Sequence, residues 1–197
     1  MSTTIIEPRI IRETNAGFSF RTLADERLEN RELEIAGEID DALANSLISQ
    51  LRYLERQDPS AEITVYVNSP GGVISSGLAL YDALQAVRCP IRMVCQGCAA
   101  SMAAVLFASG DRREMLPHAT IMVHDPLVAG EGLTGSATFL ESKVRNVMAT
   151  RTLMAQILAK HTGRTLEEVY GKTMQDTYFN ATEAIAFGLA DAVLEHF

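Results

Sequence analysis

The stretch GCAASMAA, residues 97–104, decides the fold prediction because it sets one polar side chain, Ser101, among very small residues. The preceding PIRMVC, residues 90–95, predicts a short buried strand, and Met102–Ala108 predicts a helix of good helix formers. Gly97 is expected to supply the sharp turn between them. Ser101 then lies at a helix N-terminus, where backbone N–H groups and the helix dipole favour a developing negative charge.

Ser101 has two interpretations. A nucleophile beside backbone oxyanion donors is what acyl transfer needs, and the neighbouring alanines let another chain approach the backbone closely. The alternative is an ordinary serine that caps a buried helix, since serine is a favoured N-cap residue.

Composition and charge exclude several classes of protein. Of the 197 residues, 47% are hydrophobic and 21% are charged, which indicates one globular domain, residues 1–197, with a sizeable core. The 17 basic and 25 acidic residues give a net charge of −8 without a basic run, so neither nucleic acid nor a membrane surface is an expected partner. No apolar stretch reaches the ~18–20 residues of a transmembrane helix, and the N-terminus is too polar for a secretory signal.

The three cysteines are Cys89, Cys95 and Cys98, an odd number that does not form a disulfide framework and fits a cytoplasmic location. Cys95 and Cys98 have the spacing of a redox motif or half a zinc site, but no second pair follows. We interpret them as small core residues and expect neither a metal nor a cofactor.

Strands and helices alternate at short range. The predicted strands are 33–36, 63–67, 91–95 and 119–123, and the predicted helices between them are 42–56, 74–87 and 101–108. This pattern favours an α/β fold of parallel strands with right-handed crossovers, in which sites collect beyond the carboxyl ends of strands. A turn at Gly71–Gly72, Ser101 and His124 each follow a different strand, so we expect one crevice to hold all three.

The C-terminal third begins with a glycine-rich loop at 128–135, and a long helix is predicted from Ala137 to about His161. Its apolar stripe is wide, so this helix either packs in the core or forms an interface with another subunit. Thr165 and Asn180 are predicted caps of two shorter helices. Residues 1–31 have weak periodicity and carry no structural prediction.

His124 is the best candidate base for Ser101, since imidazole accepts and returns a proton near neutral pH; the alternative is a satisfied histidine at a strand end. The other histidines are expected to be exposed: His118, His161 and His196. Spacing does not choose the carboxylate that orients the base. Asp125 should point away from His124 on a strand, and Asp176 is distinguished only by its uncharged neighbours.

Four segments carry a specific pattern: YVNSPGGVISSG (66–77), QGCAASMAA (96–104), MVHDPL (122–127) and the tail D-x-(Y/F)-x-x-A-x-E-A-x-x-x-G-L-A-D (176–191). Together, over roughly residues 33–197, the chain resembles the proteolytic subunit of the Clp protease, the ClpP family of the crotonase-like superfamily. The resemblance implies that Ser101 is the nucleophile, His124 the general base and Asp176 the carboxylate that orients it. It also implies that the N–H groups of Gly72 and Met102 form the oxyanion hole.

The resemblance further implies an α/β fold of repeated strand-helix units with helix 137–161 as a protruding handle. In the family, handles interlock two stacked seven-membered rings around a closed chamber, and an AAA+ unfoldase ATPase feeds protein into it. Extended peptide substrate pairs near Gly71, Val73 and Leu127, a form of strand addition. ATP acts on the ATPase partner, so no cofactor is implied for this chain.

The chain departs from the family's pattern at several positions. Thr64 and Ala86 stand where the groove for ATPase loops usually has aromatic residues. Met174–Gln175 replaces an acidic–arginine pair that links ring assembly to activity in the family. Residues 1–31 lack the family's usual axial-loop pattern. The loop at 128–135 is slightly longer than is usual in the family. Weak docking, a different ATPase and a mixed ring with a second subunit all remain open.

Three functions therefore compete. The leading one is a cytoplasmic serine endopeptidase that acts inside an oligomeric barrel. The second is a non-catalytic or conditionally active subunit of a mixed ring. The third is a crotonase-type acyl-CoA enzyme, against which stand the Ser101 and His124 pair and the lack of basic residues near Gly71–Gly72 to bind CoA phosphates.

Overall fold

The structure is a computed structural model that describes residues 8–15, 17–127 and 134–196. The strands are β1 (Arg9–Thr14), β2 (Gly17–Thr22), β3 (Glu32–Ile39), β4 (Ile63–Gly72), β5 (Ile91–Ala100), β6 (Arg112–Met115), β7 (Thr120–Val123), β8 (Thr177–Phe179) and β9 (Ala192–Val193). The helices are α1 (Leu23–Glu29), α2 (Asp41–Gln57), α3 (Ile74–Ala86), α4 (Met102–Ala108), α5 (Ala137–Thr162), α6 (Leu166–Thr173) and α7 (Ala181–Phe187).

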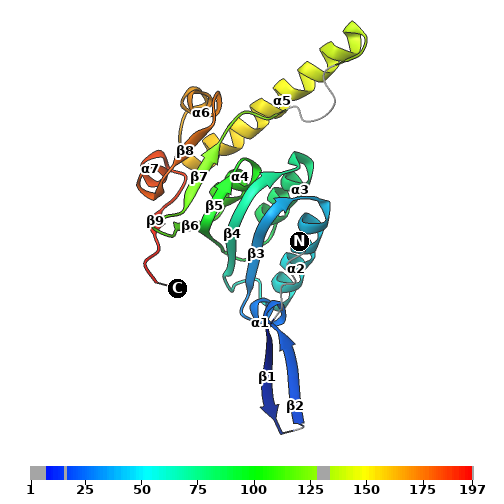
Figure 1. The fold of residues 1–197 in the computed structure, drawn as a ribbon, viewed down its shortest axis with the longest axis vertical. Helices are drawn as coiled ribbons and strands as arrows, with labels where there is room; N and C mark the ends of the chain where they lie inside the picture. Colours follow the sequence, from blue (N-terminus) through cyan, green and yellow to red (C-terminus); the bar gives the residue numbers. More distant parts are fainter. Residues whose placement is uncertain (1–7, 16, 128–133, 197) are drawn as a thin grey trace, which may run out of the picture.

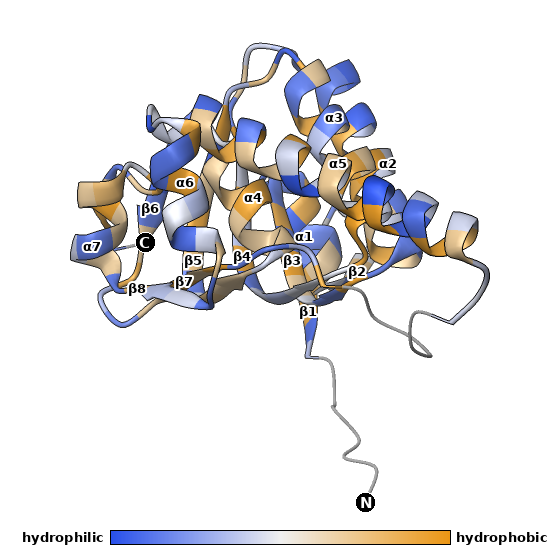
Figure 2. Ribbon diagram, turned by 90° about the horizontal axis from the view of Figure 1, so that it is seen from above, coloured by the Kyte–Doolittle hydropathy of each residue, from blue (hydrophilic) through white to orange (hydrophobic). Residues whose placement is uncertain are grey.

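The main sheet confirms the expected parallel α/β arrangement. Its strands follow the order β3-β4-β5-β6-β9, and β7 pairs with β5 beyond the point where β6 leaves it. All these pairs are parallel, whereas β8 adds to β7 in the antiparallel sense. Helices α2, α3 and α4 lie on the same side of the sheet (Figure 2). The fold therefore consists of strand-helix units that bring several strand ends to one edge.

The core follows from the sequence periodicity. Alternate residues of β4 are buried, as half-covered strands require, and α2 buries its leucine stripe: Leu47, Leu51 and Leu54. Asp40 caps α2 by accepting a hydrogen bond from the N–H of Leu43 at 2.8 Å. Every residue of α4 is buried, which explains why that helix consists of small and apolar residues.

Two predicted turns are wrong. Gly97 lies inside β5, which runs on to Ala100, and the sharp turn falls at Ser101 instead. Gly97 instead leaves room for the Asn68 side chain, since a Cβ there would come within 2.7 Å of Asn68 Oδ1. Likewise β4 runs through Gly71–Gly72, which pairs with the end of β3 after a register shift rather than forming a free turn.

The N-terminal part forms an antiparallel hairpin of β1 and β2, followed by α1, where the sequence carries no structural prediction. Figure 1 shows the hairpin projecting from one end of the molecule and α5 from the other. Ile11, Phe18 and Phe20 are exposed on the hairpin, and Ile11 lies opposite Phe20 in the strand pairing. Residues 1–7 of the expected axial segment lie outside the described residues.

Helix α5 confirms the predicted long helix and ends at Thr162, one residue beyond the expected end. Only Ala155, Ile157 and Leu158 are buried, all in its last third. Apolar side chains of its projecting part are exposed: Phe139, Val144, Met148 and Leu153. The last third of the apolar stripe of α5 therefore packs in the core. The rest of the stripe is exposed in the single chain. Of the expected loop at 128–135, residues 128–133 lie outside the described residues.

One prediction about the histidines is wrong. His118 and His196 are exposed as expected, but His161 is half-buried, with its Nε2 3.0 Å from the hydroxyl of Tyr81 on α3. The end of α5 packs against α3 there, which the local sequence does not reveal. Burial, and secondarily the charge of Lys160, lowers the pKa of His161.

The cysteines are free; Cys89 and Cys95 are buried, in agreement with their interpretation as core residues, whereas Cys98 is only partly buried. Burial raises the pKa of the Cys95 thiol to about 12, so it stays protonated and is a poor nucleophile at neutral pH. Within residues 8–15, 17–127 and 134–196, no cluster of three potential metal-ligating side chains occurs. None of the helices described is long and apolar enough to cross a membrane.

Candidate active site

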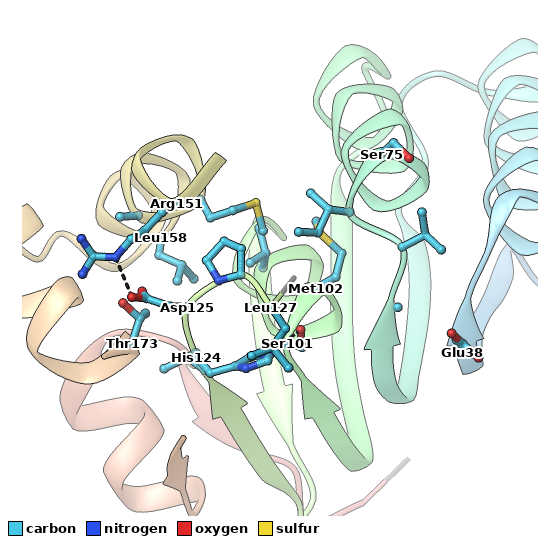
Figure 3. A pocket seen from close by; sticks show the side chains of 18 residues that line it. Glu38, Ser75, Ser101, Met102, His124, Asp125, Leu127, Arg151, Leu158 and Thr173 are labelled. Atoms are coloured by element: carbon cyan, nitrogen blue, oxygen red, sulfur yellow. Dashed lines mark hydrogen bonds and ion pairs between the residues drawn. The ribbon is translucent and has the colours of Figure 1, made fainter. Parts of the chain in front are cut away.

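A cavity of about 570 Å³ lies where β4, β5 and β7 end (Figure 3). Residues from all three strand ends line it, including Gly72, Ser101 and His124, and α5 closes one side with Met154 and Leu158. The expected convergence of these residues in one crevice is therefore confirmed. It arises because parallel strands place their carboxyl ends at the same edge of the sheet.

Ser101 forms the turn between β5 and α4 with a backbone φ of 55° and ψ of −122°. A positive φ is rare for a residue with a Cβ and costs about 1–3 kcal/mol, so the surroundings must hold it in place. The N–H of Ser101 donates to the carbonyl of Met122 in β7 at 2.8 Å, which fixes the turn to the neighbouring strand. Its side chain makes no capping hydrogen bond to α4, so the simple helix-cap interpretation is wrong.

The imidazole of His124 meets the hydroxyl of Ser101, with 2.8 Å between Nε2 and Oγ. The register of β5 on β7, in which Ala100 lies beside Met122, brings the two residues to this distance. The His124 side chain is 12% exposed, so bulk water reaches little of it. A largely desolvated base in direct contact with a hydroxyl is the arrangement that activates a serine nucleophile.

Asp176 is the carboxylate nearest to the other side of this imidazole, with 3.7 Å between Oδ1 and His124 Nδ1. The antiparallel pairing of β8 with β7, which sets Thr177 beside Val123, places Asp176 next to His124. The distance is longer than a direct hydrogen bond, and 62% of the Asp176 side chain is exposed. At this distance and exposure, an interaction between the two groups is electrostatic and partly screened by water.

Gly71 and Gly72 allow the end of β4 to lie against the nucleophile turn. Gly71 has a φ of +94°, and a Cβ on it would come within 2.7 Å of Ser101 Cβ and 3.0 Å of Met102 N. Gly72 has a φ of +156°, and a Cβ there would come within 2.3 Å of the Ile39 carbonyl oxygen. Only glycine fits this approach, which sets the backbone beside the first N–H of α4.

The other predicted binding residues divide into two groups. Val73 and Leu127 line the cavity, and both are exposed, as residues that meet an extended peptide must be. Gly71 is not among the lining residues, and its backbone lies against the Ser101 turn. The substrate-binding role of these three residues remains a prediction.

Sequence reasoning missed several features of the site. The carboxylate of Asp125 turns away from His124, as expected, but it accepts a hydrogen bond from Arg151 Nε on α5 at 2.6 Å. Nothing in the local sequence indicates this contact, because it joins a strand end to the middle of a helix. Thr173 and Glu38 also line the cavity, and the sequence pattern did not predict either of them as a site residue.

Comparison with known protein families gives one further finding. Residues 16–197 match the family model described as Clp protease. The matched range includes every strand of the main sheet, the long helix α5 and all the candidate site residues.

Proposed function

The chain belongs to the Clp protease family, a family of peptidases, and from this premise we propose that it is a serine endopeptidase. The single observation that carries the proposal is the contact of 2.8 Å between Ser101 Oγ and His124 Nε2 inside a cavity. Both residues are held by the backbone of β7, so the pair is pre-organised for proton transfer.

In the proposed reaction, Ser101 Oγ attacks the carbonyl carbon of the scissile peptide bond while His124 Nε2 takes its proton. The N–H groups of Gly72 and Met102 donate to the resulting oxyanion, which a helix N-terminus also favours. The carbon–nitrogen bond then breaks as His124 returns the proton to the leaving amine. A water molecule, deprotonated by His124, hydrolyses the ester on Ser101 and restores the hydroxyl.

Asp176 is proposed to orient the imidazole and to favour the imidazolium that forms during attack. We expect Asp176→Asn to lower kcat for a short peptide about 10- to 100-fold, less than the ~10⁴-fold effect of a buried triad carboxylate. The smaller effect follows from the exposure of Asp176 and its distance of 3.7 Å from His124. Steady-state kinetics on a fluorogenic peptide measure it, and an unchanged kcat contradicts the role.

Substrate is proposed to lie extended along the cavity, beside Gly71, Val73 and Leu127, with its backbone added to the sheet edge. Two exposed apolar side chains, Val73 and Leu127, flank this path. A chain bound in this way must be unfolded locally, which suits a peptidase that receives unfolded protein.

Clp protease family members generally act with Clp ATPases and form oligomers, and we extend both properties to this chain. The exposed apolar side chains on the projecting part of α5, including Phe139, Val144 and Met148, support an interface between two stacked seven-membered rings. An AAA+ unfoldase would dock where Thr64 and Ala86 stand. A cytoplasmic location and a mixed ring with a paralogous subunit belong to the same proposal.

Labelling the purified chain with a fluorophosphonate probe, followed by intact mass measurement, tests the proposed function. We expect one adduct on the wild type and none on Ser101→Ala, because only an activated serine attacks the phosphorus. Size-exclusion chromatography of the same samples separates the two alternatives. A large ring without an adduct favours a non-catalytic subunit, and neither ring nor adduct contradicts the barrel peptidase.

A further inference from the structure

We propose that Arg151 is a positioning residue for the base: it ties Asp125, the residue after His124, to α5 and so fixes the imidazole beside Ser101. The inference rests on the proposed serine peptidase function. It concerns a residue 26 positions from Asp125 whose Nε donates to that carboxylate, not to Ser101 or His124.

Arg151 joins three elements at one point. Its Nε donates to Asp125 Oδ2 at 2.6 Å, which Figure 3 marks with a dashed line. Its guanidinium carbon lies 4.2 Å from the ring centroid of Tyr170 on α6, a cation–π distance. The N–H of Asp125 in turn donates to the carbonyl of Thr173 at the end of α6, at 2.6 Å. These three contacts thus connect the end of β7, the middle of α5 and α6.

The burial of the pair shows that it is more than a surface ion pair. The Arg151 and Asp125 side chains are 23% and 32% exposed, and both line the cavity that contains Ser101. Partial burial strengthens a charged hydrogen bond, and stacking on Tyr170 restricts the guanidinium further. Loss of either partner leaves the other charge in the wall of the cavity without its counterion.

His124 depends on these contacts because it lies just beyond the ladder of β7. On one side the pairing of Val123 with Thr177 holds the backbone. On the other side the next residue in the chain is Asp125, which Thr173 and Arg151 hold through its N–H and its carboxylate. Loss of the hydrogen bond to the Asp125 carboxylate leaves only the hydrogen bond from its N–H to Thr173 on this side of His124. A displacement of about 1 Å at a reacting group costs up to ~10²-fold in rate.

The pair also balances charge around the imidazole. Asp176 lies 3.7 Å from His124, and the charged side chains of Asp125, Arg151 and Glu38 line the same cavity. Removing Arg151 alone leaves the Asp125 carboxylate uncompensated one residue from the base, which favours the protonated imidazole. The acid limb of kcat/KM then moves to higher pH. Asp125→Asn leaves the cation uncompensated, and the acid limb moves to lower pH.

The experiment compares Arg151→Met, Arg151→Lys, Asp125→Asn and the double variant Arg151→Met/Asp125→Asn with the wild type. The matched control is Arg88→Met, because Arg88 Nε also donates to a carboxylate, Glu55 at 3.1 Å, but its side chain is 75% exposed and outside the cavity. Each protein is measured for kcat, KM and the pH profile with a short fluorogenic peptide. Fluorophosphonate labelling rate and oligomeric state are measured on the same preparations.

We expect Arg151→Met to lower kcat about 10- to 100-fold with KM within about twofold of the wild type. Arg151→Lys keeps the charge but loses the Nε geometry and the stacking, so its loss of kcat is smaller and its acid limb stays in place. The double variant removes both charges and brings the acid limb back to the wild-type position without restoring kcat. Arg88→Met matches the wild type in every measurement.

The outcomes separate this inference from the proposed function. If the wild type gives no adduct at Ser101, both are overturned. If the wild type is labelled but Arg151→Met keeps its kcat and pH profile, the positioning role is overturned and the peptidase function stands. The role is also overturned if both single variants lose activity with the oligomer and show no opposite shifts of the acid limb. If Arg151→Met does not fold, Arg151→Lys and Asp125→Asn decide by the same criteria.

Discussion

Replacing His124 with alanine is expected to lower kcat for peptide hydrolysis by about 10⁴- to 10⁶-fold. Without the imidazole, the Ser101 hydroxyl has no acceptor for its proton, since His124 Nε2 at 2.8 Å is the base the geometry provides. The leaving amine also loses its proton donor. The fold should persist, because the side chain lies just beyond the end of β7 and lines a cavity. Steady-state kinetics and thermal unfolding of the same preparation measure both expectations.

The double variant Ser101→Ala/His124→Ala provides the control. Nucleophile and base act as one unit, so the double variant should lose no more activity than either single variant. Additive losses show that the two residues act independently and contradict the proposed mechanism. A His124→Ala variant that retains a tenth of wild-type activity excludes His124 as the general base.

Replacing Gly71 with alanine is the second change with a large expected effect. The new Cβ would come within 2.7 Å of Ser101 Cβ, and a φ of +94° is unfavourable for alanine. Either the nucleophile turn or the end of β4 must move, which misplaces both the hydroxyl and the oxyanion donors. We expect kcat to fall by roughly 10³-fold or more, because loss of one oxyanion donor alone costs about 10²–10³-fold. The free energy of unfolding should fall by about 1–3 kcal/mol.

Gly171→Ala is the matched control for this variant. Gly171 lies in α6, and a Cβ there would meet nothing within 4 Å. Alanine is a better helix former than glycine, so we expect unchanged activity and a gain of about 0.5–1 kcal/mol in the free energy of unfolding. If Gly71→Ala behaves like this control, the close approach at the active site is not required.

The sequence predicts the arrangement of the site well where a single rule of topology applies. Parallel strands end at one edge, so Gly72, Ser101 and His124 could be placed in one crevice before any distance was known. Asp176 could not be selected by the same argument. It reaches His124 through the antiparallel pairing of β8 with β7, and a strand of three residues carries too weak a pattern to reveal its partner.

The errors have specific physical causes. Glycine is typical of turns, but Gly97 lies inside β5, where its small size leaves room for the Asn68 side chain. In the hairpin of β1 and β2, the alternation of Phe18 and Phe20 is too short to predict a strand, and both side chains are exposed. Arg151 meets Asp125 across two elements, and such contacts depend on packing rather than on local pattern.

The backbone of Ser101 has a further consequence, which concerns the evolution of the chain. A φ of 55° suits glycine better than any residue with a Cβ. The residue with the least backbone strain at this position is therefore glycine, which has no side chain to attack a peptide bond. Selection for thermodynamic stability alone would favour glycine at position 101, whereas selection for hydrolysis retains serine. The site is therefore a place where stability is traded for activity, and compensating substitutions that stabilise the protein belong elsewhere in the chain.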